Sequence, residues 1–91
     1  MNRDAVIAIM NEAKRLYLDA VIELTIPNQE DTELIVVSPR SVDSKIDYYL
    51  NTYDADGIHI NNSQIRMVGA GIAECVAFHS YTGDSDEHRS Y

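Results

Sequence analysis

Few side chains in this 91-residue chain could act as a nucleophile and a base. Cys75 is the single thiol, and the histidines are His59, His79 and His88. In a helix, Cys75 and His79 would be neighbours at i and i+4, a spacing that a thiol and its general base could use. In a strand they would lie about 13 Å apart. Because Cys75 lies among small apolar residues, we interpret it as a core residue and expect no enzymatic activity.

The turn YDADG, residues 53–57, has the aspartates of a calcium loop without its ligand spacing. Placing Gly57 at the sixth position of an EF-hand loop puts Thr52 at the first position and Ser63 at the twelfth, where carboxylates are required. The chain also lacks the paired cysteine and histidine spacing of a zinc site. We therefore predict no metal or cofactor, and interpret the turn as a helix end at which Gly57 adopts a positive φ.

Charge restricts the class of partner. Fifteen acidic residues against seven basic ones give a net charge of −8, which disfavours direct contact with nucleic acid or anionic membranes. The acids could simply keep the chain soluble, or they could form a surface complementary to a basic groove on a host protein. The candidate partner-binding residues lie in or near one predicted helix, although Lys45 interrupts them in sequence: they are Asp43, Asp47, Tyr48, Asp54 and Asp56.

The first half of the chain has the apolar spacing of one helix and two strands. Apolar residues three and four positions apart predict a helix over residues 4–18. Alternating apolar residues predict a strand over residues 20–26, and the run Glu33–Ser38 predicts a second strand paired with it in antiparallel fashion. Residues 34–37 are apolar on both faces, which would suit cover by a helix on one side and by a second subunit on the other.

The second half predicts a helix over residues 42–53 and then a hairpin. Its strands are expected at residues 58–60 and 64–68, around the turn Asn61-Asn62-Ser63. The Gly69-Ala70-Gly71 segment is typical of a bulge or bend in a long strand. Residues 72–81 are ambiguous between strand and short helix, and their alternation favours a strand.

These patterns predict a single α+β domain over residues 1–81 in the order α-β-β-α-β-β. The four-stranded, mainly antiparallel sheet would have both helices packed against it. Residues 82–91 have no apolar periodicity and predict a disordered acidic tail. A lone cysteine without a recognisable signal peptide favours the cytoplasm, and no run approaches the roughly 20 apolar residues of a membrane span.

The run VDSKIDYYLNTYDADGIHINNSQIRMV resembles a segment of small phage and prophage accessory proteins, in which a YY, then a YD with an acidic turn, then a hairpin recur. The resemblance covers about a third of the chain and implies a phage protein that binds a host protein or serves in virion assembly. We therefore expect a non-enzymatic protein that binds and inhibits a host protein in the host cytoplasm, as a nucleic-acid mimic or an anti-defence factor. The alternatives are a structural homo-oligomer, including a homodimer, and a small-ligand binder that uses His59, His79 and tyrosines.

Overall fold

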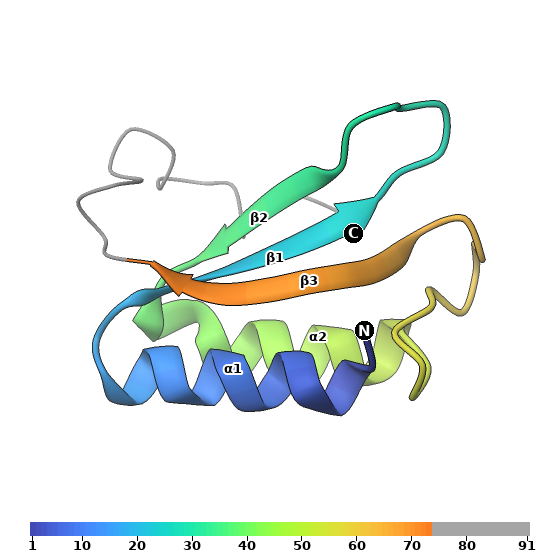
Figure 1. The fold of residues 1–91 in the computed structure, drawn as a ribbon. Helices are drawn as coiled ribbons and strands as arrows, with labels where there is room; N and C mark the ends of the chain where they lie inside the picture. The colour runs from blue at the N-terminus through green and yellow to red at the C-terminus, as the bar shows by residue number, and fades with distance from the viewer. Residues whose placement is uncertain (74–91) are drawn as a thin grey trace.

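Three antiparallel strands form a sheet that has two helices on one face (Figure 1). The computed structural model describes residues 1–73. The elements in chain order are α1 (Arg3–Arg15), β1 (Asp19–Thr25), β2 (Glu33–Val37), the 3₁₀ turn η1 (Pro39–Ser41), α2 (Val42–Thr52) and β3 (Arg66–Ala73). The predicted α+β domain with two helices and an antiparallel sheet is therefore confirmed, whereas the four-stranded sheet and the exact order are not.

Helix α1 has a side-chain cap at its start and a left-handed residue after its end. The Asn2 side chain accepts a hydrogen bond from the Ala5 amide at 2.7 Å, which satisfies one of the free N–H groups of the first turn. At the other end the Leu18 amide bonds to the Ala13 carbonyl and the Tyr17 amide to the Lys14 carbonyl. This pattern is a Schellman motif, and it puts Tyr17 at a φ of 58°. The helix therefore ends at Arg15, three residues earlier than predicted.

Strand β1 is the central strand, in the order β2-β1-β3. Its residues Ala20, Ile22 and Leu24 are fully buried in the cluster that also contains the inner face of α1. Alternation thus places every second residue of β1 against the helices. Glu23 pairs with Gly69 and Leu24 with Met67, so Val68 is an extra residue in β3. The predicted bulge was assigned to the Gly69-Ala70-Gly71 segment, which instead pairs in register with β1, and the bulge lies one residue earlier.

The predicted second hairpin is replaced by an irregular segment. Residues 58–60 form only isolated bridges, Tyr53 with His59 and Ile58 with Arg66. The amide of Ile60 bonds to the Thr52 carbonyl at the end of α2, whereas the amide of His59 bonds to the Ile65 carbonyl just before β3. The segment is therefore attached to both elements without forming a continuous ladder. Two main-chain amides in this segment donate to nearby side chains. The Asn61 amide donates to Nδ1 of His59, and the Gln64 amide donates to Oδ1 of Asn62. Such local bonds compete with a β-ladder, which explains why the chain turns here but does not form the predicted strand over residues 58–60.

The predictions for residues 74–91 lie outside the described part of the chain. These include most of the ambiguous segment 72–81, of which Ile72 and Ala73 end β3, and the boundary between the domain and the tail. Within residues 1–73, no helix has the length and apolar character needed to cross a membrane.

Candidate binding surface

The outer side of α2 exposes the first two predicted aspartates. Asp43 and Asp47 are both exposed and lie about one helical turn apart. Lys14 of α1 contacts both carboxylate oxygens of Asp43, at 2.9 and 2.8 Å. Asp47 has no ion pair among the described residues. The negative charge of this helix face is therefore centred on Asp47, while that of Asp43 is partly compensated.

Lys45 does not interrupt the acidic face, contrary to what its sequence position suggested. Its side chain is turned inward and the residue is only 5% exposed. The ammonium lies 5.1 Å from the ring centroid of Tyr48 and 5.4 Å from that of Tyr49. A cation over aromatic faces is stabilised by the ring quadrupoles. The positive charge of Lys45 is thus held beneath the helix, and the exposed side of α2 presents its aspartates.

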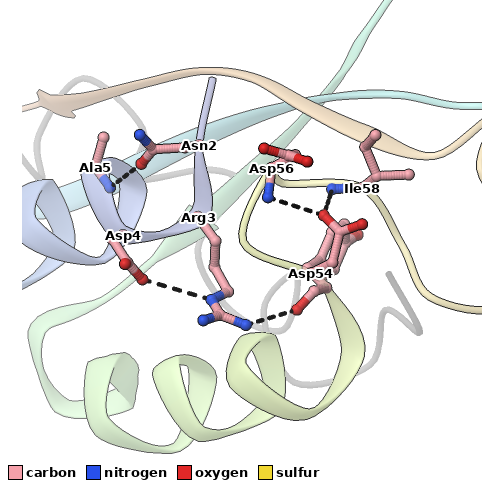
Figure 2. A network of polar contacts seen from close by, with 8 residues as sticks. Asn2, Arg3, Asp4, Ala5, Asp54, Asp56 and Ile58 are labelled. Carbon is pink, nitrogen blue, oxygen red and sulfur yellow. Dashed lines mark hydrogen bonds and ion pairs between the residues drawn. The ribbon is translucent and has the colours of Figure 1, made fainter.

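Asp54 and Asp56 lie together in the turn after α2, but only Asp56 points its carboxylate away from the turn (Figure 2). Oδ1 of Asp54 accepts hydrogen bonds from the amides of Asp56 and Ile58, at 2.9 and 3.0 Å. Gly57 follows with a φ of 78°, as predicted for the end of the helix. Asp54 therefore shapes the turn that presents Asp56, a role that sequence reasoning did not assign to it.

The N-terminal residues hold this turn in place. The guanidinium of Arg3 donates to the Tyr53 carbonyl at 2.9 Å (Figure 2). The Arg3 amide donates to the Ala55 carbonyl at 3.1 Å. The amino group of Met1 donates to the Met67 carbonyl at 3.1 Å. These bonds connect the start of α1 with the end of α2 and with β3. The two bonds of Arg3 therefore fix the backbone that carries Asp54 and Asp56.

The three tyrosines in α2 and at its C-terminal end divide between the core and the surface. Tyr49 and Tyr53 are buried, and their rings meet edge to face with centroids 5.3 Å apart. The Tyr53 ring also meets His59 edge to face at 5.1 Å. Burial raises the pKa of the Tyr53 hydroxyl, with a smaller contribution from Tyr48. Only Tyr48 is half-buried, so it is the one tyrosine of this group that could contact a partner.

The residues considered for catalysis are not brought together in residues 1–73. Cys75, His79 and His88 lie outside the described residues. His59 packs against Tyr53, and its Nδ1 accepts a hydrogen bond from the Asn61 amide at 3.1 Å. In the same part of the chain, no group of three histidine, cysteine, aspartate or glutamate residues could hold a metal ion.

The structure has a second charged surface that the sequence analysis did not predict. A hollow of about 600 Å³ lies between the end of α1 and η1, and we call it the basic groove. Its described lining residues are Asn11, Lys14, Arg15, Tyr17, Pro39 and Arg40. The only sequence signal was the pair of basic residues in the last turn of α1, because Arg40 lies 25 positions later than Arg15.

No family model, curated protein or solved structure matches this chain.

Proposed function

We propose that this protein is a non-enzymatic, phage-type binding protein that inhibits a host protein by covering a basic surface on it. The contact residues are those of the acidic surface: Asp43, Asp47, Tyr48, Asp54 and Asp56. A groove that normally holds the phosphate backbone of nucleic acid would be a suitable target, because carboxylates at fixed positions can take the place of phosphates. The cytoplasm of the host is where such a target would be met.

The observation that carries this proposal is the fixed turn that presents Asp56. Arg3 and Asp54 hold its backbone through four hydrogen bonds, and the same turn follows directly from the helix that exposes Asp47. A preorganised surface loses less conformational entropy when it binds. With Lys45 turned inward, the acids face outward without a competing cation of the same helix. Complementary charge would then steer the encounter and make it sensitive to salt.

The test is capture of the host target by matched charge variants. Tagged wild-type protein at micromolar concentration is mixed with host lysate at 0.1 M salt, and the captured protein is identified and purified. Binding of that protein is then measured for Asp47→Lys/Asp56→Lys and for the control Glu30→Lys/Asp31→Lys, which changes the charge equally in the loop between β1 and β2. Asp54 is left intact because its substitution would disturb the turn.

The proposal predicts at least a tenfold loss of affinity for the first variant and a much smaller loss for the control. It also predicts that the complex dissociates at 1 M salt, where the Debye length falls to about 3 Å. Equal losses in the two variants would show that overall charge, rather than this surface, governs binding. Undiminished binding by Asp47→Lys/Asp56→Lys would refute the proposal.

A structural role in a homo-oligomer is the second candidate, and exposed apolar side chains on the strands favour it. Leu34 of β2 is 52% exposed and Val68 of β3 is 43% exposed. Contacts through such residues would bury apolar area and would persist at high salt. Self-association that is unchanged between 0.1 and 1 M salt and is lost in Leu34→Lys would support this candidate over the inhibitor.

A further inference from the structure

The basic groove is lined by three of the cations of the described residues. Six of the seven lysines and arginines lie in the described residues. Three of these contact main-chain carbonyls or aromatic rings: Arg3 the Tyr53 carbonyl, Lys45 the tyrosine rings, and Arg66 the Ser63 carbonyl. The other three, Lys14, Arg15 and Arg40, all line the groove. A local positive surface in a chain of net charge −8 is suited to an acidic ligand.

Arg40 is the cation most available to such a ligand. Lys14 pairs with Asp43 at 2.8 Å, and Arg15 forms two contacts with Glu12. Both pairs are solvent-exposed, so they contribute little and can be exchanged for another carboxylate. Arg40 is exposed and has no ion pair among the described residues. An incoming carboxylate can therefore pair directly with Arg40, and it can replace the present carboxylate partners of Lys14 and Arg15.

Tyr17 adds an aromatic side chain to the groove at an unusual position. It occupies the left-handed site of the Schellman motif, where glycine is favoured, and it is 82% exposed. A residue with a Cβ is disfavoured in this conformation. Glycine would therefore be favoured at this site for backbone conformation alone, and a tyrosine at the rim of a groove is well suited to an interface.

An acidic segment, opposite in charge to the groove, lies at the other end of the molecule. The loop between β1 and β2 extends beyond the sheet at the end opposite to the junction of α1 with β1 (Figure 1). Residues 28–32 of this loop, which we call the acidic loop, are all exposed and contain Glu30 and Asp31. Because β1 begins beside the groove and ends at the loop, the two features are separated by the length of the strand, about 23 Å for seven residues.

We propose that the acidic loop of one copy docks into the basic groove of a second copy, so that the protein associates head to tail. The two surfaces lie at opposite ends of one chain, and this contact is therefore heterologous and can repeat into open chains. At 0.1 M salt the Debye length is about 10 Å. The net repulsion between copies is then largely screened across a molecule 32 Å long, whereas charges in direct contact still attract. This inference does not depend on the proposed inhibition of a host protein.

The decisive experiment mixes two variants that each lack one of the two surfaces. Arg40→Glu removes the open cation of the groove, and Glu30→Lys/Asp31→Lys removes the acids of the loop. Sedimentation of each full-length protein is followed up to 1 mM at 0.1 M and 1 M salt. Far-ultraviolet circular dichroism confirms that each variant is folded. Asp47→Lys/Asp56→Lys is the control, since it changes the charge as much as the loop variant without touching either docking surface.

Wild-type protein should form species that grow with concentration at 0.1 M salt and dissociate at 1 M salt. Each surface variant alone should associate at least tenfold more weakly, while their equimolar mixture should form a dimer and nothing larger, because only one loop and one groove remain competent. The control should associate like wild type. A wild-type monomer at 1 mM, a mixture without dimer, or full association by Arg40→Glu would overturn the proposal.

A second measurement uses Tyr17. The variant Tyr17→Gly should raise the unfolding midpoint, because glycine removes the disfavoured left-handed conformation, and should weaken association at least threefold. A purely structural tyrosine would change stability without affecting association, and that outcome would remove Tyr17 from the docking surface.

Discussion

Replacing Gly57 with alanine tests whether the N-terminal residues really close over the turn after α2. Gly57 has a φ of 78°, and its amide and carbonyl both form main-chain hydrogen bonds, to the Asp54 carbonyl and from the Met67 amide. A Cβ at this position would lie 2.3 Å from the Met1 carbonyl oxygen and 3.2 Å from the Met67 Cβ. Backbone would have to move to make room, since neither contact is with the flexible end of a side chain.

The expected loss of stability follows from three contributions. The left-handed conformation costs about 1–2 kcal/mol for a residue with a Cβ. Displacing Met1 breaks its hydrogen bond with the Met67 carbonyl, which contributes about 0.5–1.5 kcal/mol. The more restricted unfolded chain offsets about 0.4–1 kcal/mol of this loss. Gly57→Ala should therefore destabilise the protein by about 2 kcal/mol, which lowers the urea midpoint by about 1–2 M for a chain of this size.

Urea unfolding followed by circular dichroism measures this change, and the two glycines of β3 provide the controls. A Cβ at Gly71 would meet nothing within 4 Å, so Gly71→Ala should be neutral or stabilise by about 0.5 kcal/mol. At Gly69 the Cβ would meet the end of the Glu23 side chain at 2.9 Å, which can rotate away, and Gly69→Ala should be nearly neutral. If Gly57→Ala is as stable as Gly71→Ala, the reasoning about the closed turn is wrong.

Two further predictions concern the turn and the core beside it. Asp54→Ala should cost about 1 kcal/mol, because two main-chain amides lose their acceptor, whereas Asp56→Ala should leave the melting temperature unchanged; equal effects would contradict the assignment of Asp54 to the turn. Burial raises the pKa of Tyr53, so the folded protein keeps this proton at a pH where the unfolded chain, with a pKa of about 10, releases it. Its contribution to stability is therefore complete below about pH 10 and is lost as the pH rises further, by up to about 1.4 kcal/mol per pH unit. Denaturation at pH 9 and pH 11 should show a smaller alkaline loss in Tyr53→Phe than in wild type, and identical losses would refute this assignment.

Periodicity predicted the elements whose burial pattern repeats along the chain. The helices α1 and α2 and the strands β1 and β2 all lie within three residues of the predicted bounds. Their apolar residues recur at the period of a helix or strand that has one side against a core, and this information is local. The turn at Gly57 was also predicted, because glycine favours backbone conformations that other residues avoid. The glycines at 69 and 71 predicted an irregularity in β3, but the bulge lies one residue before them.

The candidate surface was predictable in part. The acidic character of α2 and its turn is a matter of composition, and Asp47 and Asp56 are exposed as expected. The turn-shaping bonds of Asp54 and the ion pair of Asp43 with Lys14 could not be read from the sequence. Each depends on where a side chain points or on a residue far away in the chain. The same limit explains the missing strand at residues 58–60, whose backbone contacts are divided between the end of α2 and the start of β3.

The amino-acid sequence by itself determined the net charge of this protein, the period of its helices and strands, and the positions of its turns, because each depends on residue type and near neighbours. The tertiary structure alone decided which charges remain available for binding. It turned Lys45 beneath two tyrosines, and it brought Arg40 beside Lys14 and Arg15 to form the basic groove. Contacts between segments distant in the chain decide which side chains are buried and which are brought together, and local periodicity does not predict these contacts.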